Sequence, residues 1–509
     1  MGLNNMSLSA STVLAVNVGS SSIKTSLFGE SGRIDVNVNF IGLKTQILKI
    51  VYRTKHLDSE EKDEVVVGND FSKASCLVIQ KLKEALLQVG WSAPKKIGHR
   101  VKFSGVGPTV QEFTNHMKNV LAFNDYLSSR HNSLCSAVIY EAKKAFPDAL
   151  QLLVRDHAVE GLSLHSEEQI PFDKALIKRY GLYSNGYHGL AIKACLKELK
   201  IKYGISKYTG LICQIGSGVS VTTVVDGAVK FNTMQFAACD GPVMHNRSGT
   251  QPVGLILRML KYGVDPNCLS HVYNRESGIY GLASLPSDSD VTVEKILGDK
   301  RLAPVKNAYL TSCAVEIFKA ASLMPECSNF VFSGGLATKH KWLSLELLHR
   351  SKNISLHSKL KIISQLGKDK GGKINEEGKS IIIVEIDEQI QIAEEISESC
   401  NKHAYFDFSS GVCEVPGSSS GTVKMGADGW GEGMISLNYS DTGFEFNMDT
   451  LPEAFIFSGG NRREFFLRSV FARRARVPTI FIEEAEFDMS AILNKIIFLD
   501  TPTKLGFEL

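Results

Sequence analysis

The chain has 509 residues, which is too long for one hydrophobic core, so we expect two domains and an appended segment. Hydrophobic residues make up 43% of the chain and charged residues 22%, a balance that excludes a disordered or fibrous protein. The net charge is only +3 and the basic residues are scattered, so charge does not favour nucleic acid or a membrane surface as a partner.

Two further features of the composition concern the compartment. No apolar stretch reaches the ~18 residues of a membrane span, and the first residues lack a basic region followed by an apolar run. The 10 cysteines form no CxxC pair, which is typical of reduced, buried thiols rather than of disulfides or a metal-thiolate site. We therefore expect a cytoplasmic protein.

The N-terminal part predicts alternating strands and helices. Residues 12–28 contain two β-rich runs, VLAVNV and IKTSLF, joined by the polar turn GSSS. Apolar residues at helical spacing follow at Ile79, Leu82 and Leu86, and then come a strand-like run, IGHRVKF, and a helix-like stretch at 133–145. This order is typical of an α/β domain.

A similar unit of strand, glycine turn and strand returns in the second half. GLICQIG and VSVTTVV flank a turn at residues 216–218. Apolar residues at helical spacing between 305 and 320 predict a buried helix, which leads into the strand NFVFSGG and a third glycine turn at Gly334 and Gly335. Because the unit occurs twice, we expect two facing halves.

The last part of the chain changes character. Residues 351–380 are rich in Lys and Ser and predict an exposed loop, and Gly-Ser runs begin at about Cys400. IFSGG at 456–460 repeats VFSGG at 331–335, and FIEEAE, which starts at Phe481, is similar to VEIDEQ, which starts at Val384. Two interpretations stay open: chance similarity of short motifs, and a degenerate partial duplication.

The first glycine turn has the composition of a phosphate cradle. Phosphate groups need closely approaching backbone N–H groups, which glycine permits, and hydroxyl or cationic side chains that complete the contact. Asn17, Gly19, residues 20–22 and Lys24 supply these groups. GSSS alone is a common loop composition, so this interpretation depends on the other motifs of the chain.

Together with those motifs, the sequence resembles the acetokinase family of the sugar kinase, Hsp70 and actin (ASKHA) superfamily, from about Thr12 to Glu398. The family's Asn-x-Gly-Ser-Ser-Ser-x-Lys motif is matched in full. Further motifs follow in the family's order: GHRV at 98–101, His131-Asn132, Asp156, GYHG at 186–189, VMxxRSG at 243–249, ESG at 276–278, Ser287-Asp288, FSGG at 332–335 and DEQIQIA at 387–393.

The resemblance implies a fold and a division of the chain. The fold is α/β, the two-domain ASKHA (ribonuclease H-like) type with a cleft between duplicated domains. Residues 1–160 would form an N-terminal acetokinase-like domain and residues 161–398 a C-terminal, nucleotide-binding one. Residues 399–509 would be an extension of unknown role, which includes the two repeated motifs. Family members commonly pair through the second domain, so the resemblance also implies a homodimer.

The resemblance implies roles for the matched residues, with ATP as co-substrate and Mg²⁺ as cofactor. Arg100 and Arg247 would bind the acceptor carboxylate and the phosphoryl group, His188 would stabilise that group during transfer with support from His131, and Asp156 would position Arg100 or the metal. Asn17 and Glu388 would hold Mg²⁺ directly or through water. The nucleotide would contact Ser20, Ser22, Lys24, Gly216, Ser217, Gly218, Asp288, Ser333, Gly334 and Gly335.

The nucleotide side departs from the family's pattern. Gln214 and Ser217 stand where the family has His and Asn, and Asp290 stands where it has Arg. The family's Gly-Glu-Asn after the third glycine turn is replaced by residues 337–339, Ala-Thr-Lys. The phosphoryl donor, whether ATP, another nucleoside triphosphate or pyrophosphate, therefore stays open.

The acyl pocket departs further. The family encloses the substrate methyl group with Val, Leu, an aromatic residue and Pro, whereas this chain has Lys102, Arg130, Tyr187 and Ala238. Burying unpaired cations against a methyl group is costly. One hypothesis is a larger, more anionic acceptor, such as a dicarboxylate or a phosphorylated acid. The alternative is that Lys102 and Arg130 point away or pair with acids such as Glu160.

Three functions follow from these observations. The first is a carboxylate kinase, in which ATP and a short carboxylic acid give ADP and an acyl phosphate. The second is a nucleotide-binding pseudokinase or regulatory protein, which the lost His, Asn and Glu-Asn positions and the extension favour. The third, a sugar or polyol kinase, needs a general-base Asp beside a hydroxyl and gives no reason for two carboxylate-binding arginines.

Overall fold

The computed structural model divides the chain into two compact units. One comprises Met1–Ser104, Glu112–Val159 and Asn185–Glu394, and the other comprises Gly105–Gln111, Glu160–Ser184 and Glu395–Leu509. The structure describes residues 12–19, 22–41, 45–68, 70–102, 109–128, 131–158, 170–180, 182, 184–286, 289, 291–324, 327, 329–350, 362–364 and 380–398, and eight short strands between 403 and 482.

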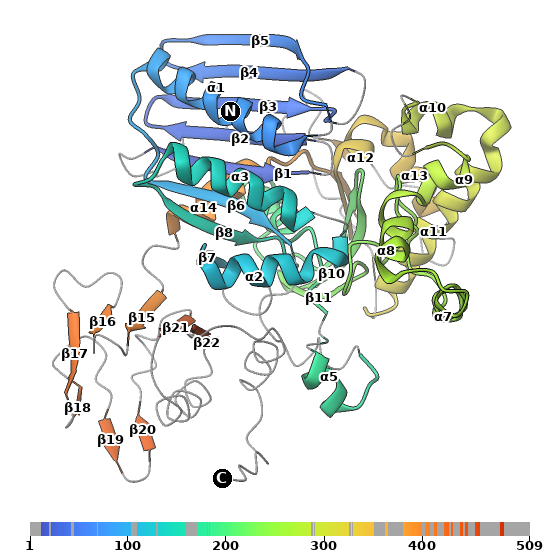
Figure 1. Cartoon of the computed structure of the whole chain (residues 1–509). Coiled ribbons are helices and arrows are strands. Elements are labelled where there is room, and N and C mark those ends of the chain that lie inside the picture. Colours follow the sequence, from blue (N-terminus) through green and yellow to red (C-terminus); the bar gives the residue numbers. More distant parts are fainter. Residues whose placement is uncertain are drawn as a thin grey trace. The chain divides into compact units, whose positions relative to one another are not determined.

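The first unit contains two β-sheets, and the first of these is built from the N-terminal part (Figure 1). Its strands have the order β5-β4-β3-β2-β1-β6-β8. Strands β1, β2 and β3 are antiparallel neighbours, whereas β6 and β8 run parallel to β1. Their bounds are β1 Val13–Val18, β2 Ser22–Gly29, β3 Gly32–Asn39, β4 Gln46–Thr54, β5 Asp58–Val65, β6 Lys96–Val101 and β8 Leu150–Arg155. A short strand, β7 (Val110–Glu112), follows β6 in the chain.

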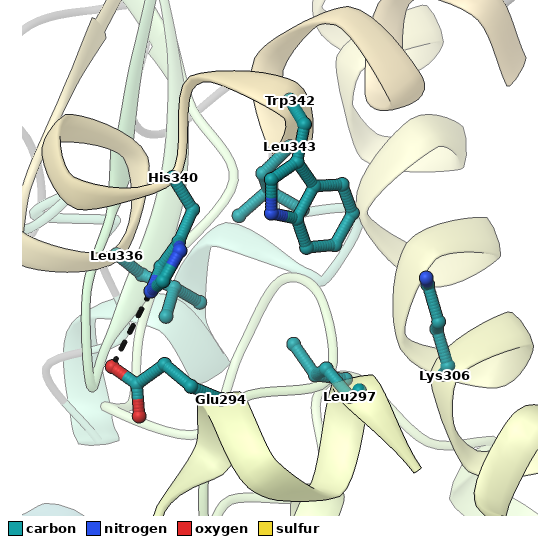
Figure 2. Close-up of a pocket in the computed structure, with 8 residues that line it drawn as sticks. Glu294, Leu297, Lys306, Leu336, His340, Trp342 and Leu343 are labelled. Carbon is teal, nitrogen blue, oxygen red and sulfur yellow. Dashed lines mark ion pairs between the residues drawn. The ribbon is translucent and has the colours of Figure 1, made fainter. Parts of the chain in front are cut away.

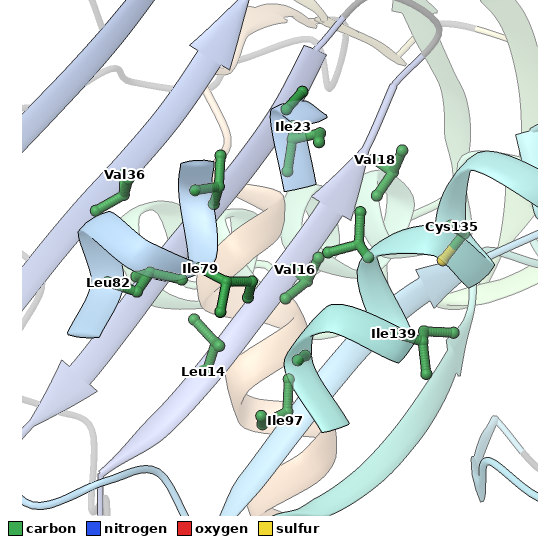
Figure 3. Packing of buried hydrophobic residues seen from close by; sticks show 14 of the residues in the cluster. Leu14, Val16, Val18, Ile23, Val36, Ile79, Leu82, Ile97, Cys135 and Ile139 are labelled. Atoms are coloured by element: carbon green, nitrogen blue, oxygen red, sulfur yellow. The ribbon is translucent and has the colours of Figure 1, made fainter. Parts of the chain in front are cut away.

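Two helices, α1 (Phe71–Val89) and α3 (His131–Ala145), pack on one face of this sheet. Figure 3 shows Leu14 and Val16 of β1 beside Ile79 and Leu82 of α1, in a cluster that also contains residues of α3. Helix α1 begins where the Asp70 carboxylate accepts backbone N–H groups and ends at a glycine in the left-handed conformation. In the chain, α2 (Asn115–Phe123) and a 3₁₀ turn, η2 (Asn124–Ser128), come between α1 and α3.

The second sheet is built from the second half of the same unit. Its order is β11-β10-β9-β12-β14-β13, with β9, β10 and β11 antiparallel and β12, β14 and β13 parallel to β9. The bounds are β9 Gly210–Ile215, β10 Val219–Val225, β11 Ala228–Asn232, β12 Asn329–Ser333, β13 Ile362–Ser364 and β14 Ser380–Ile383. The strands expected at 12–28, 97–103, 210–225 and 329–333 are confirmed, as are the helices expected near 79–86, 133–145 and 305–320.

Helices flank the second sheet, and none of those in the described ranges is long and apolar enough to cross a bilayer. Helix α11 (Ala303–Ala321) contributes the most residues of any helix to the hydrophobic core on this sheet, and its Tyr309 and Ile317 are fully buried. The helices are α6 Gly189–Tyr203, α7 Val253–Lys261, α8 Pro266–Arg275, α9 Gly278–Leu282, α10 Val293–Gly298, α11 Ala303–Ala321, α12 Gly335–Lys339, α13 Lys341–Arg350 and α14 Glu388–Glu398, with a 3₁₀ turn, η3, at Lys300–Leu302.

The second unit contains a helix, α5 (Lys174–Tyr180), and a third sheet of the order β18-β17-β16-β15-β21-β22. Here β15, β16 and β17 are antiparallel neighbours, and β21 and β22 run parallel to β15. The same five-strand scheme occurs in the first sheet as β3-β2-β1-β6-β8 and in the second as β11-β10-β9-β12-β14. The bounds are β15 His403–Asp407, β16 Val412–Glu414, β17 Thr422–Gly426, β18 Gly429–Trp430, β21 Ala454–Ser458 and β22 Thr479–Ile482, with a hairpin of β19 Asn438–Ser440 and β20 Gly443–Glu445.

Candidate active site

Polar residues at the carboxyl ends of three parallel strands form the first part of the site. Asn17 lies at the end of β1, Arg100 near the end of β6, and Asp156 directly after β8. Because these strands are parallel neighbours, their carboxyl ends meet at one edge of the sheet. Glu388, the first residue of α14, lies at the same edge, where Asn17 Nδ2 donates a hydrogen bond of 2.7 Å to its Oε2.

Arg100 is the centre of this cluster. Its Nε donates to Asp156 Oδ2 at 2.9 Å, its Nη2 donates to the same oxygen, and its Nη1 donates to Asn17 Oδ1 at 2.9 Å. Glu388 Oε2 lies 3.6 Å from Nη1. Burial alone would lower the pKa of Arg100, but the carboxylates of Asp156 and Glu388 raise it above its ordinary value. The guanidinium is therefore fixed in place and charged.

Asp156 connects Arg100 to the second half of the unit. Its carboxylate is fully buried, and its Oδ1 accepts the backbone N–H of Leu190 at 3.2 Å. Leu190 lies in the first turn of α6, two residues after His188. Glycine is required between them, because a Cβ on Gly189 would lie 1.7 Å from the carbonyl oxygen of His157. Both oxygens of Asp156 thus have structural partners.

His188 is held in an unusual backbone conformation at the start of α6. Its φ of 62° lies in the left-handed region, which few residues other than glycine adopt. Its Nδ1 lies 2.9 Å from Ser220 Oγ on β10. Burial, followed by the charges of Lys102 and Arg100, lowers the pKa of His188 to about 3. The imidazole is therefore neutral near pH 7.

Arg247 and Gly218 complete this side of the site. A Cβ on Gly218 would lie 3.1 Å from His188 Nε2 and 3.3 Å from Arg247 Nη1, so the glycine turn runs directly past both side chains. Arg247 Nη1 donates to the carbonyl oxygen of Ala238 at 3.2 Å. Burial, followed by the charge of Arg275, lowers the pKa of Arg247 to about 10, which leaves the guanidinium charged at neutral pH.

Lys102 and His131 also belong to this site. Lys102 follows β6 directly and is only 4% exposed, and His131, the first residue of α3, is 6% exposed. Burial and the charge of Arg100 lower the pKa of Lys102 well below its ordinary value. Burial and the charge of Lys102 lower the pKa of His131. The burial of Lys102 and its interaction with the charge of Arg100 favour a position within the site over one that points away, and its proposed partner Glu160 lies outside the described residues.

The other three residues expected in the acyl pocket are less informative. Tyr187 is fully buried, and its hydroxyl donates to the carbonyl oxygen of Phe236 at 3.0 Å. Ala238 is 1% exposed, and its carbonyl oxygen is the acceptor for Arg247. Both belong to the core cluster of the second half. Arg130 lies outside the described residues.

Two of the predicted glycine turns lie side by side in the second sheet. Gly216 N donates to the carbonyl oxygen of Gly218 at 3.0 Å, which closes the turn between β9 and β10 around Ser217. Gly334, with a φ of 90°, follows Ser333 of β12, and a Cβ on it would lie 2.6 Å from the carbonyl oxygen of Ile215. A Cβ on Gly216 would lie 3.7 Å from Gly335 N. These turns meet because β9 and β12 are parallel neighbours.

The first glycine turn is described only in part. Gly19 N donates to the carbonyl oxygen of Ser22 at 2.8 Å. Lys24 lies directly opposite Asn17 in the antiparallel register of β1 and β2, so the exposed Lys24 shares a face with a member of the Arg100 cluster. Ser20 lies outside the described residues, as do Asp288 and Asp290.

A cavity of about 370 Å³ lies beside the third glycine turn (Figure 2). Its floor is apolar, with Leu297, Leu336 and Leu343, and Leu336 directly follows Gly335. Figure 2 shows His340 beside Glu294, with Nε2 and Oε1 3.6 Å apart, and Trp342 facing the side of α11 that carries Lys306. The sequence analysis assigned no role to these residues, because apolar and charged residues at helical spacing give no binding signal.

A buried ion-pair network that no sequence motif indicates lies next to Glu388. Arg33 on β3 donates to Asp35 Oδ1 at 2.6 Å, to Ser26 Oγ at 2.9 Å, and to Asp387 Oδ2. Asp387 in turn accepts the backbone N–H of Gln389 at 3.0 Å and so caps α14. Arg33 and Asp35 alternate with apolar residues along a strand, which was the only signal available in the sequence.

Asn17 and Glu388 fit the magnesium role that the resemblance implies. They offer an amide oxygen and a carboxylate, which are hard oxygen ligands, from directly contacting side chains. Mg²⁺ in phosphotransferases usually takes one or two protein ligands and completes its shell with water and substrate phosphates. No cluster of three or more His, Cys, Asp or Glu able to hold a metal occurs among the described residues, so a metal here would depend on such additional ligands.

Comparisons with known proteins agree with this geometry. A model described as the Acetokinase family matches residues 12–394. The acetate kinase of Alkaliphilus metalliredigens is 28% identical over 345 residues, which cover 64% of this chain and 83% of that protein. The acetate kinase of Clostridioides difficile is 27% identical over 367 residues, with 66% and 86% covered.

Solved structures show the same fold. The acetate kinase from Entamoeba histolytica has a TM-score of 0.60 at 20% identity and covers 76% of this chain and 99% of its own. A propionate kinase from Francisella tularensis has a TM-score of 0.59 at 18% identity, with 76% and 98% covered. The expected α/β fold of the ASKHA type is confirmed. Because the family model also spans most of its length, the chain belongs to the Acetokinase family.

Proposed function

We propose that the protein is an ATP-dependent carboxylate kinase, which transfers the γ-phosphoryl group of ATP to a short-chain carboxylic acid and releases ADP and an acyl phosphate. The observation that carries this proposal is the grouping of Arg100, His188 and Arg247. His188, which is buried and neutral, and the half-buried, charged Arg247 lie beside the turn at Gly218, and the buried, charged Arg100 acts electrostatically on both of them. Such a group of fixed donors is suited to charge that develops on a transferring phosphoryl group.

The acceptor chemistry needs no general base. A carboxylic acid is already ionised near pH 7, so one carboxylate oxygen attacks the γ-phosphorus as the bond to the bridging oxygen breaks and its electron pair leaves with ADP. Arg100 and Arg247 would bind the carboxylate and the phosphoryl oxygens. Asp156 would position Arg100. Since both of its oxygens are occupied by Arg100 and Leu190, Asp156 is a poor general base, which disfavours a sugar or polyol kinase.

His188 and His131 would support the transferring group. When the Ser220 hydroxyl donates a hydrogen bond to Nδ1 of His188, the neutral ring carries its own proton on Nε2. Nε2 lies beside the Gly218 turn. A single preorganised donor of this kind is typically worth about 10²–10³ in rate. His131 is also uncharged near pH 7, because burial and the charge of Lys102 lower its pKa. Neither ring then adds charge to a site that already holds two guanidinium groups.

The nucleotide would be held by the backbone N–H groups of Ser217, Gly218 and Gly335, with Ser22 and Lys24 on the opposite side, whereas the N–H of Gly216 closes the turn itself. Mg²⁺, held by Asn17 and Glu388 directly or through water, would neutralise the β- and γ-phosphates when bound. The cavity beside Leu336 would receive the nucleoside, because it adjoins the third glycine turn. Quenching of Trp342 fluorescence by ADP, absent in Trp342→Phe, is the expected result; unchanged quenching in that variant would place the nucleoside elsewhere.

A homodimer is part of the proposal. None of the residues of α7 is buried, although Val253, Leu255, Leu257 and Leu260 are apolar and expose between 40% and 67% of their surface. A helix with this composition is usually covered by a partner. We expect a dimer in light scattering with size-exclusion chromatography, and a monomer for Leu257→Glu; an unchanged dimer in that variant would exclude α7 from the interface. The cytoplasmic location stays a prediction.

The proposed function can be tested with a hydroxamate assay, which traps acyl phosphate, using ATP, Mg²⁺ and a panel of carboxylic acids. Arg247→Ala should lower kcat/KM at least about 100-fold, because it removes a half-buried, charged donor to the transferring group. Arg301→Ala is the matched control, because the Arg301 side chain is 89% exposed. ATP binding without product from any acid would instead support the pseudokinase.

A further inference from the structure

Lys102 is a buried lysine of the candidate active site, two residues after Arg100, and the following inference rests on the proposed function. The residue is 4% exposed and directly follows β6, which carries Arg100. Its charge acts on His131 and His188, and the charges of Arg100, Arg247, Asp156 and Glu388 act on it. The ammonium group therefore lies among the groups that would handle the acceptor and the phosphoryl group.

The two carboxylates of this cluster are already used. Asp156 binds Arg100 and the N–H of Leu190, and Glu388 binds Asn17 and lies near Arg100. Within the part of the chain that the structure describes, Lys102 forms no ion pair and no hydrogen bond. The charged groups that act on Lys102 are thus two guanidinium groups, Arg100 and Arg247, and two carboxylates, so a protonated Lys102 would leave this set with one net positive charge.

Such an arrangement favours an anionic ligand. A buried ammonium without a partner is costly, and burial and the neighbouring charges accordingly lower the pKa of Lys102. An anion placed beside Lys102 would favour its charged form and gain a charge-assisted hydrogen bond. A methyl group at the same place would neither stabilise the charged form of Lys102 nor accept a hydrogen bond from it. The amine of Lys102 would then be buried against an apolar group.

We propose that the acceptor is a carboxylic acid with a second anionic group, and that Lys102 binds this second group while Arg100 and Arg247 hold the reacting carboxylate. Tyr187 does not compete for that role, because its hydroxyl is bound to Phe236 and its ring packs edge-on against His157 with centroids 5.8 Å apart. The second group is a carboxylate or a phosphate-like group, since either one satisfies a single ammonium.

The test compares acids of matched length. Malonate, succinate and glutarate are paired with propionate, butyrate and pentanoate, and 3-phosphonopropionate represents the phosphate-like group. For the wild type, kcat/KM of the best dianionic acid should exceed that of its monoanionic match at least about tenfold. Lys102→Met should remove this preference through KM of the acid, with KM of ATP unchanged, and Lys102→Arg should retain it. Lys83→Met, at an exposed lysine of α1, is the control.

Two results would overturn the proposal while the kinase stands. In one, monoanionic acids are the best substrates of the wild type and Lys102→Met keeps the same order. In the other, Lys102→Met raises KM of ATP and not KM of the acid, so that Lys102 serves the donor. A preference for the phosphonate over every diacid would identify the second group as phosphate-like, and the reverse order as a carboxylate.

Failure of the proposed function would look different, because no acid would be phosphorylated. Calorimetric titration of succinate and butyrate without ATP then tests Lys102 by itself. Tighter binding of succinate that is lost in Lys102→Met would support the anion site without the kinase. Equal binding of the two acids, or binding of neither, would overturn it.

Discussion

At the scale of single residues, the site is a set of buried polar groups whose partners fix their charge and direction. Arg100 keeps its charge although it is buried, because two carboxylates face it, whereas burial and neighbouring cations oppose the protonation of His188. The pKa of Arg100 rises and that of His188 falls, because carboxylates act on Arg100 whereas cations are the strongest charges acting on His188. The ordinary pKa values of arginine and histidine do not include burial or neighbouring charges, so they do not predict how far the pKa of each residue shifts.

Ser220 is expected to position His188. Ser220→Ala removes the only side-chain contact recorded for Nδ1 within the described residues, so the ring loses the partner that selects its tautomer. We predict that kcat falls about tenfold while KM of the acid and of ATP change less than about twofold. Ser322→Ala, at an exposed serine that ends α11, should have wild-type kinetics. A matching rise in KM would instead make Ser220 part of substrate binding.

Four buried histidines and one half-buried histidine predict a fold that loses stability in acid. Burial lowers the pKa of His99 from 6.5 to about 4, and it is also the largest cause of the lowered pKa values of His131, His157, His188 and His245. Between these pH values the unfolded chain binds more protons than the folded chain. The free energy of unfolding therefore falls as the pH falls from 6.5 toward 4.

His99 is suited to a test of this pH dependence of the unfolding free energy, because its ring does not contact solvent. The residue is fully buried, and its Nε2 lies 2.9 Å from Gln151 Oε1. His99→Gln should make the loss of unfolding free energy below pH 6 smaller by about 1.4 kcal/mol per pH unit, whatever its effect at pH 7. Urea unfolding at pH 7, 6 and 5 measures the slope. Equal slopes for variant and wild type would show that His99 does not titrate on unfolding.

At the scale of elements, the connection between β3 and α14 places a candidate metal ligand. Arg33 is 8% exposed and binds Asp387, and the next residue, Glu388, is the one that contacts Asn17. Asp387 also caps α14. The start of this helix is therefore tied to the first sheet by Asp387 and by Glu388 itself.

Arg33→Met should loosen that turn. We predict that the Mg²⁺ concentration for half-maximal activity rises about tenfold, and that high Mg²⁺ restores most of kcat, because Glu388 is misplaced rather than lost. Arg53→Met is a matched control: Arg53 contacts the same Asp35 at 3.0 Å, but its side chain is 52% exposed, and such pairs contribute about 1 kcal/mol or less. If both variants behave alike, Arg33 contributes to stability alone.

Much of the fold could be predicted from local patterns, but the connections of the site could not. Residues 13–29 and 210–225 were recognised as strands around glycine turns, because alternation and turn residues are local signals. The hydrogen bond from Arg33 to Asp387 joins residues 354 apart, and an arginine in an alternating strand usually faces solvent. The left-handed backbone conformation of His188 depends on tertiary contacts, so it could not be predicted from the local sequence.

At the scale of the whole molecule, the third sheet bears on the extension that begins near residue 399. Its strands β17-β16-β15-β21-β22 follow the scheme of the other two sheets, and the stretches whose sequences resemble β12 and the segment after β14 begin in β21 and β22. We infer a third, partial copy of the same half-domain. The domain boundaries at 160 and 398 stay predictions.

Removal of residues 401–509 tests whether this copy is needed. The family match ends at residue 394, and both sheets of the first unit complete the five-strand scheme without the extension. We predict that the shortened chain keeps kcat within about twofold and unfolds within about 3 °C of the full chain, since the buried hydrophobic clusters on the two sheets of the first unit consist of residues before 399. Insolubility or loss of nucleotide binding would show that the extension is part of the catalytic body.

The central claim is that the γ-phosphoryl group moves to a carboxylate. The most direct measurement follows γ-³²P-labelled ATP with Mg²⁺ and the acid panel, and asks whether label appears in a product that hydroxylamine destroys. The account predicts labelled acyl phosphate from the wild type and at least about 100-fold less from Arg247→Ala. Nucleotide binding with no label transferred to any acid would contradict it, and would leave a nucleotide-binding protein built on a kinase fold.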